Sequence, residues 1–120
     1  MLNLDLHNRI FVGVENYDGG DANQDTVFRY YQDGDLVWGS YEGGRVRHGQ
    51  VLARLTPGGS LDMVWQYLNL DDQLIAGTCT STPVLLPDGR YRLNEKWVIT
   101  LGPATGVSGE SAIEEIIEES

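Results

Sequence analysis

The sequence predicts an all-β protein that forms a single antiparallel up-and-down β-barrel of about eight strands. Six clusters of turn-forming residues divide the chain, and the segments between them are short and rich in β-branched and aromatic residues. Glycine adopts positive φ, proline restricts φ and aspartate bonds its own backbone, so each cluster favours a chain reversal. Strands of even length joined by tight turns form a meander, which typically closes into a barrel. The clusters are Asp18-Gly19-Gly20, Asp33-Gly34-Asp35, Glu42-Gly43-Gly44, Pro57-Gly58-Gly59, Asp71-Asp72-Gln73 and Pro87-Asp88-Gly89.

The first four strands are predicted from alternation of side chains between two faces. In the second of them, Phe28 and Tyr30 share one face. Asp33-Gly34 then favours a tight hairpin, because this dipeptide suits the turn whose twist matches paired strands. Gly49 lies in the middle of a long fourth strand and predicts a bulge or a barrel corner there. These strands are expected at residues 8–14, 26–32, 36–41 and 45–55.

The later strands are expected at residues 61–70, 74–82 and 90–101. In the last of these, alternation places Leu93, Glu95 and Trp97 on one face together with Tyr91 and Ile99. Two structures remain open for the tail, residues 109–117. A strand would seal the sheet against the first strand, and a helix would cap the barrel mouth. Closure of some kind is expected, since unpaired edges invite aggregation.

Composition restricts the class of protein. A chain of 120 residues suits one domain, and we expect residues 1–120 to form a single barrel domain with an acidic C-terminal segment from about residue 109. The formal net charge of −10 disfavours binding to nucleic acid or to a membrane surface. Cys79 is the only cysteine, which excludes an internal disulfide and a cysteine-based zinc site. No signal peptide is evident, and we predict a cytoplasmic protein without a cofactor.

Glu95 is the candidate residue that the alternation makes most informative. Its neighbours on the same face, Leu93 and Trp97, mark that face as the barrel interior. A buried carboxylate must pair with another group, take up a proton, or face a cavity that holds water or a ligand. Three interpretations follow: an internal pair with an arginine or tyrosine, an anchor for a ligand, and a general acid or base.

Aromatic residues form the second candidate group. An eight-stranded barrel has room either for packed side chains or for one small ligand, so these rings either fill the interior or line a cavity. Inward-facing Gly39, Ala53 and Gly77 would leave room for a cavity. The predicted ligand-binding residues are Tyr30, Tyr41, Trp65, Glu95 and Trp97.

Other chemical signals are weaker. Asp21, Asn23 and Asp25 alternate as in the opening of a calcium loop, but Thr26 and Gln32 replace the glycine and the glutamate that such a loop requires. We therefore expect an acidic solvated turn and no metal site. His48 could approach Cys79 in a barrel, although one residue of each type does not define a catalytic pair.

Several segments resemble a family of small bacterial proteins that are often labelled N-acetylglutamate synthase. The segments are 26–30, 41–46, 77–83 and 88–97, and the resemblance extends over roughly residues 8–115. This family is similar to the calycin-type barrels, the group of lipocalins and avidins, and so implies a lipocalin- or avidin-like barrel. The label implies an N-acetyltransferase activity. Trp65-Gln66-Tyr67 stands where the family pattern has a Tyr-His pair.

These observations predict an uncharacterised barrel that binds a small amphipathic or apolar molecule in its interior and has no catalytic residues. One alternative is an enzyme in which Glu95 acts as the acid or base. Another is a structural or interaction module that forms a homodimer through barrel faces bearing Trp38 or Tyr31. The nature of the ligand is left open by the sequence.

Overall fold

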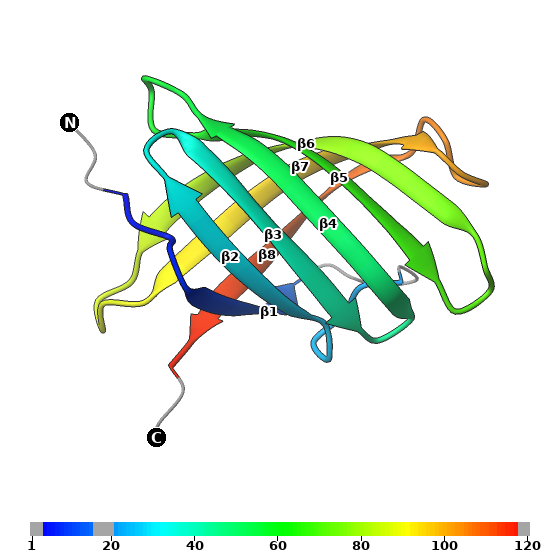
Figure 1. The fold of residues 1–120 in the computed structure, drawn as a ribbon, viewed down its shortest axis with the longest axis horizontal. Helices are drawn as coiled ribbons and strands as arrows, with labels where there is room; N and C mark the ends of the chain where they lie inside the picture. Colours follow the sequence, from blue (N-terminus) through cyan, green and yellow to red (C-terminus); the bar gives the residue numbers. More distant parts are fainter. Residues whose placement is uncertain (1–3, 16–20, 118–120) are drawn as a thin grey trace.

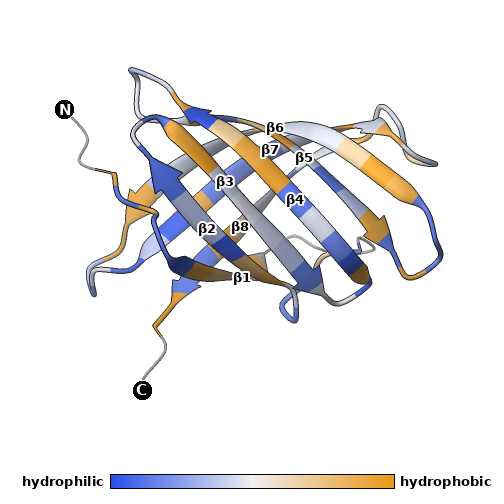
Figure 2. Cartoon of the chain, in the orientation of Figure 1, coloured by the Kyte–Doolittle hydropathy of each residue, from blue (hydrophilic) through white to orange (hydrophobic). Residues whose placement is uncertain are grey.

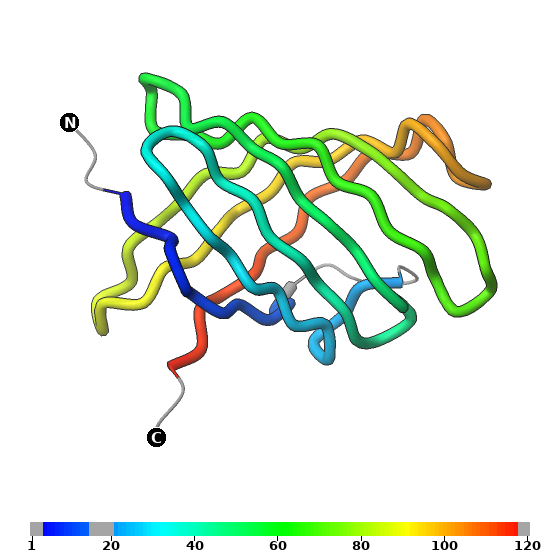
Figure 3. The backbone as a smooth tube through the Cα atoms, viewed as in Figure 1, coloured from blue at the N-terminus to red at the C-terminus, as the bar shows by residue number. Residues whose placement is uncertain are grey.

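The computed structural model describes residues 4–15 and 21–117, and its strands form one closed barrel in the order β1 to β8 (Figure 1). Every strand is antiparallel to the next, and β8 pairs with β1 to complete the ring. The tube in Figure 3 traces the same path, with each hairpin returning beside the strand before it. The all-β, up-and-down barrel predicted from the sequence is therefore confirmed.

The strand bounds lie within a few residues of those predicted. They are β1 Arg9–Glu15, β2 Val27–Asp33, β3 Leu36–Gly43, β4 Val46–Leu55, β5 Leu61–Asn69, β6 Leu74–Leu85, β7 Tyr91–Leu101 and β8 Ser108–Ile116. β6 differs most, because it continues beyond Thr82 and keeps Pro83 in register with Leu93. The tail, for which both a strand and a helix were open, is the strand β8 and seals the barrel against β1.

Five of the six predicted turns fall within the described residues and do reverse the chain. Gly34 and Asp72 both have φ near +60°, the left-handed conformation that favours glycine, aspartate and asparagine. The remaining cluster, Asp18-Gly19-Gly20, lies outside the described residues. One turn was not predicted: the β7–β8 connection, in which Gly102 and Gly106 have positive φ.

Gly49 does not produce the predicted bulge. The register of β4 shifts between Val46 and His48, whereas Gly49 pairs regularly with Tyr41 and with Tyr67. A Cβ at Gly49 would overlap the ring of Tyr41, so this glycine makes room for an aromatic side chain. Glycine is therefore required at this position because a larger residue would clash with the Tyr41 ring, and not because the hydrogen-bond ladder is interrupted there.

The barrel interior is packed at one end. Leu6, Phe11, Leu93 and Ile113 are fully buried there, and the N-terminal segment lies across this end. The Leu6 amide donates to Gln32 Oε1 (2.8 Å), and the Gln32 side chain donates in turn to the Leu4 carbonyl.

Alternating hydropathy along the strands is visible as orange and blue bands in Figure 2.

No helix within the described residues is long and apolar enough to cross a membrane.

Candidate functional site

A cavity of about 140 Å³ occupies the barrel at the end opposite the packed core. Its walls come from all strands except β1 and from the segment that precedes β2. Leu6, Phe11 and Leu93 fill the other end of the interior. The interior is therefore largely packed but retains one cavity, so the aromatic residues both fill the interior and line a cavity. The six aromatic residues of the cavity wall are Phe28, Tyr30, Tyr41, Trp65, Tyr67 and Trp97.

The large rings of the wall are seated on glycines of neighbouring strands. Trp65 is the cross-strand partner of Gly77, and Trp97 is the partner of Gly109. A Cβ at either glycine would overlap the indole ring that covers it. Aromatic rings often cover cross-strand glycines in this way. Gly77 is inward-facing as the sequence suggested, but the room it leaves is taken by Trp65 and not by the cavity.

The aromatic side chains contact one another around the wall. Phe28 stacks on Tyr41 with ring centroids 4.8 Å apart, and Tyr67 meets the edge of Tyr41 at 6.1 Å. Trp65 stacks on Tyr67 at 5.9 Å, and its indole nitrogen donates to the Thr78 carbonyl. These contacts hold the rings in place before any ligand arrives, which reduces the entropy lost on binding.

Glu95 lies in this cavity wall, on the interior face of β7 as predicted. It is half-buried, and its side chain lines the cavity. Burial raises the pKa of Glu95 to about 8, because the charged form loses its hydration. Glu95 makes no ion pair with any described residue, so the predicted pairing with an arginine is not found, whereas a pairing with a tyrosine stays a prediction.

Two serines flank Glu95 on the neighbouring strands. Ser81 and Ser111 are its direct cross-strand partners, and both are buried. The Ser81 hydroxyl is close enough to favour the ionised form of Glu95, which partly opposes the rise in pKa. It is nevertheless fully buried and makes no hydrogen bond of good geometry within the described structure. Buried hydroxyls are normally bonded, so this end of the cavity has spare hydrogen-bonding capacity.

Asp21 forms the second acidic part of the cavity wall. Its carboxylate accepts hydrogen bonds from the Tyr67 hydroxyl (2.9 Å) and the Asn69 amide (3.2 Å). Arg45 Nε lies 3.4 Å from the other oxygen. The sequence analysis expected an acidic solvated turn at Asp21, and this is wrong for that residue, because it folds back over the barrel mouth.

In the cavity wall, the hydroxyls of Tyr41 and Tyr67 form hydrogen bonds, and burial favours the neutral forms of Tyr67 and Cys79. The Tyr41 hydroxyl donates to the Gln66 carbonyl, and burial together with Asp21 raises the pKa of Tyr67 above its usual range. Burial, assisted by the negative charge of Glu95, likewise raises the pKa of the Cys79 thiol. Cys79 thus behaves as the small apolar residue that was predicted.

The two weaker signals of the sequence do not form sites. His48 is exposed on the outside of β4 while Cys79 is buried inside, so the suggested approach of these residues does not occur. Within residues 4–15 and 21–117, no group of three or more His, Cys, Asp or Glu side chains is placed to hold a metal ion.

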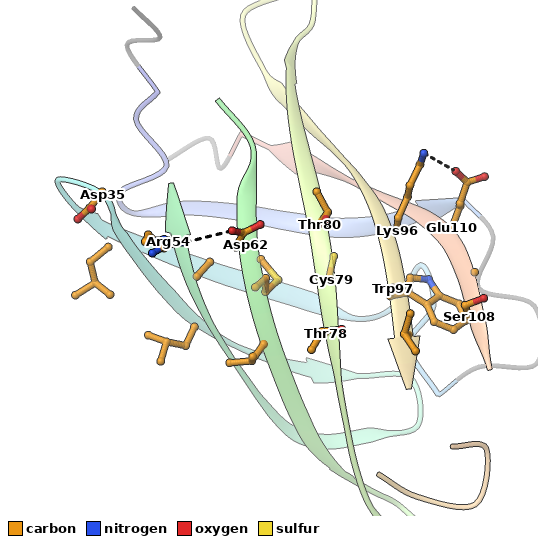
Figure 4. A pocket seen from close by; sticks show the side chains of 17 residues that line it. Asp35, Arg54, Asp62, Thr78, Cys79, Thr80, Lys96, Trp97, Ser108 and Glu110 are labelled. Carbon is orange, nitrogen blue, oxygen red and sulfur yellow. Dashed lines mark hydrogen bonds and ion pairs between the residues drawn. The ribbon is translucent and has the colours of Figure 1, made fainter. Parts of the chain in front are cut away.

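A larger depression, of about 1130 Å³, lies on the outside of the barrel (Figure 4). Exposed apolar side chains, among them Leu52 and Val64, form part of its floor. Ion pairs cross it between adjacent strands: Arg54 with Asp62 at 3.5 Å and Lys96 with Glu110 at 3.9 Å. All four charged side chains are more than half exposed, so these pairs contribute little to stability. The depression has the features of an outer surface and not of an enclosed site.

All five sequence-predicted site residues lie against the inner cavity. Their role in binding stays a prediction. The wall also contains Asp21, Met63 and Ser111, which the sequence analysis did not select. Strand alternation could have found Met63, because it shares a face with Trp65, whereas Ser111 lies in the tail, for which both a strand and a helix were open. Asp21 could not have been found, since it reaches Tyr67 across 46 residues of sequence.

Comparison with known proteins identifies one family. The profile of a family described as avidin-like protein matches residues 4–116. No curated protein and no solved structure gives a significant match to the chain.

Proposed function

The chain belongs to the avidin-like protein family, and from this membership we propose that it binds a small, largely apolar molecule inside the barrel. The observation that carries the proposal is the cavity of about 140 Å³, whose wall combines six aromatic residues with a few polar groups at Glu95 and Ser111. Apolar pockets with a small number of placed polar groups are typical of ligand sites. In this proposal Tyr30, Tyr41, Trp65 and Trp97 contact the ligand body and Glu95 orients its polar group.

The size of the cavity limits the ligand. An apolar cavity of about 150 Å³ accommodates benzene. The cavity of this protein therefore suits a molecule, or one end of a molecule, of roughly that size. Coenzyme A derivatives are far larger and strongly anionic, and no lysine, arginine or histidine lines the described wall. The acetyltransferase activity implied by the sequence resemblance consequently receives no support from the cavity, and an acid or base role for Glu95 stays a prediction.

Calorimetric titration with benzyl alcohol tests the proposal, with biotin as a second probe because it is a ligand of avidin-like proteins. We expect benzyl alcohol to bind the wild type and to bind Ile99→Phe at least tenfold more weakly, since Ile99 lines the cavity and the larger side chain fills it. Thr100→Phe is the matched control, because Thr100 is exposed at the neighbouring position and lies outside the cavity wall.

Native mass spectrometry of protein purified from its own host provides an independent readout. A co-purifying small molecule that is lost in Ile99→Phe supports interior binding. The proposal is contradicted if no probe binds the wild type and no molecule co-purifies with it. Equal binding of benzyl alcohol to the wild type and a folded Ile99→Phe would place the bound probe elsewhere and also contradict it.

We propose self-association as a second function of the fold, through the outer face of β3 to β8. One row of this face is apolar: Trp38, Leu52, Val64 and Val98 are exposed and lie in register across β3, β4, β5 and β7, with Thr78 between the last two. Exposed apolar rows of this kind mark interaction surfaces more often than free surface.

The adjacent row suggests that the partner is a second copy of the chain. Its cross-strand order is Arg54, Asp62, Thr80, Lys96 and Glu110, so the charges alternate about the neutral position on β6. A two-fold axis along β6 places each charge opposite one of the other sign. Two-fold interfaces are self-complementary, and this pattern satisfies that requirement.

Light scattering at two protein concentrations tests the dimer. We expect a dimer at the higher concentration and a monomer for Val64→Glu, which places a carboxylate in the apolar row. Leu70→Glu is the control, since Leu70 is 57% exposed and outside that row. A wild type that is monomeric at both concentrations contradicts the proposal.

A further inference from the structure

Building on the proposed function, we propose that the ligand of the inner cavity is a small organic cation, whose ammonium group pairs with Glu95 among the aromatic rings. Binding in the interior does not by itself decide the chemical class of the ligand. Its grounds are the charges of the wall, the rings around them and the size of the space.

The charges of the wall favour a cation. Asp21 and Glu95 are its only ionisable residues other than tyrosine and cysteine, and within the described residues no lysine, arginine or histidine lines it. Asp21 is already held by Arg45, Tyr67 and Asn69. Glu95 alone lacks a cationic partner. A nearby positive charge strongly stabilises the charged form of a buried carboxylate, and in this cavity the ligand is the group that can supply it.

Another glutamate of the same barrel pairs with a cationic side chain of the protein itself. Glu115 is only 6% exposed, and both of its carboxylate oxygens accept hydrogen bonds from Arg9 (3.0 and 3.1 Å). It also accepts a hydrogen bond from the Tyr91 amide. Within the described residues no ion pair of this kind is found for Glu95, whose cross-strand partners are Ser81 and Ser111.

The aromatic rings supply the remainder of a cation site. An ammonium group is attracted to the face of tryptophan, tyrosine or phenylalanine, and this attraction is larger when the site excludes water. Phe28, Tyr41, Tyr67, Trp65 and Trp97 surround the cavity together with Tyr30. A cavity of about 140 Å³ holds an ammonium group with a few carbon atoms. A long polyamine or a lipid does not fit within it.

Protonation of Glu95 makes the binding of a cation depend on pH. With a pKa of about 8, roughly one tenth of the carboxyl groups are ionised at neutral pH, so a cation must first displace a proton. Its affinity is therefore expected to rise by up to about tenfold for each pH unit below the pKa and to level off above it. The other titratable groups that face the cavity are Asp21, Tyr30, Tyr41, Tyr67 and Cys79. Burial raises the pKa of Tyr67 and of Cys79, so both stay neutral over this range.

Titration calorimetry with choline and its neutral isostere, in which a tert-butyl group replaces the trimethylammonium group, tests the inference. At about pH 9 we expect choline to bind at least about tenfold more tightly than the isostere, because only choline neutralises Glu95. At about pH 6 choline should lose at least about tenfold in affinity while the isostere is unaffected.

Two variants of equal net charge complete the test. Glu95→Gln should abolish the preference for choline and its pH dependence while the isostere still binds. Glu42→Gln should behave as the wild type, since Glu42 is exposed and lies outside both the cavity wall and the charged row of the outer face. Binding of the isostere without choline, or an unchanged preference in Glu95→Gln, overturns the cation inference and leaves interior binding intact. If neither probe nor benzyl alcohol binds, both proposals fall.

Discussion

Two glutamates of this barrel, Glu95 and Glu115, have different hydrogen-bonding and charge partners. Glu115 is bonded to Arg9 and to the Tyr91 amide, whereas Glu95 has no cationic partner within the described residues. Burial disfavours the charged form of Glu95, which lacks such a charged hydrogen-bond partner. Glu95 is thus left with a raised pKa, and the pH dependence of stability should report it.

Glu95 is expected to lower the stability of the fold as the pH rises. The folded-state pKa of about 8 lies above the value of 4.5 for an unperturbed glutamate, so the folded protein binds more protons between these values. The free energy of unfolding contributed by this group is therefore largest below about pH 4.5 and is lost as the pH rises to about 8. With allowance for water in the cavity, the loss is roughly 3 kcal/mol.

Urea unfolding of the wild type and Glu95→Gln over this pH range provides the measurement. The difference in stability should move in favour of Glu95→Gln as the pH rises and should stay constant above about pH 8. Glu42→Gln, which removes an exposed carboxylate outside the proposed interface, is the control and should remain parallel to the wild type. A wild type and Glu95→Gln that run parallel across the whole range would contradict a raised pKa.

At the scale of the strand, cross-strand pairs of an aromatic residue and a glycine shape the cavity wall. Tyr41 on Gly49, Trp65 on Gly77 and Trp97 on Gly109 follow one rule, in which a ring lies over the direct partner that lacks a Cβ. These pairs fall on β3–β4, β5–β6 and β7–β8. The strands thereby hold large rings flat against the wall and leave space between them.

Gly77→Ala should be strongly destabilising for this reason. A Cβ at this position would overlap both the Trp65 ring and the Val98 carbonyl, and the carbonyl cannot move without disturbing the ladder. Overpacking of a buried site of this kind costs about 3 kcal/mol in the free energy of unfolding.

Gly58→Ala is the matched control for urea unfolding, because it lies in an exposed turn where a Cβ would meet only Thr56 Oγ1 at 3.9 Å. Its effect should stay within about 0.5 kcal/mol. If both alanine variants were equally stable, the seating of Trp65 on Gly77 would not be a determinant of the fold.

At the scale of the whole molecule, closure of the barrel connects distant parts of the chain. β1 pairs with β2 on one side and with β8 on the other, and Arg9 and Glu115 link the first and last strands at the packed end. The guanidinium of Arg9 also lies over the Tyr91 ring at 5.0 Å. This closure leaves no free sheet edge between the described strands, and it encloses both the core and the cavity.

The distribution of charge over the whole molecule agrees with a cationic ligand. The formal net charge is −10, and a negative field raises the local concentration of cations and their rate of association. The same charge opposes self-association unless the interface pairs opposite charges, as the Arg54 to Glu110 row does under a two-fold axis. The proposed ligand site therefore lies inside the barrel, and the proposed dimer interface lies on its outer face.

The sequence by itself determined the class of fold, the first seven strands and their order, five of the described turns and the interior position of Glu95. These features depend on local chemistry: positive φ at turn residues and the strict alternation of side chains along a strand. Alternation also selected Tyr30, Tyr41, Trp65 and Trp97 as facing the interior. The bulge expected at Gly49 was wrong, because the role of that glycine depends on a ring from another strand.

Only the tertiary structure decided which part of the interior is hollow and which groups surround Glu95. The cavity depends on where Leu6 and Phe11 fill the barrel, where Asp21 folds over its mouth, and which rings cover which glycines. Each of these contacts joins residues that are far apart in sequence, and their register is set only when the barrel closes. For the same reason, the local sequence of the tail fits both a strand and a helix. The tail forms the strand β8 because it pairs with the free edges of β1 and β7.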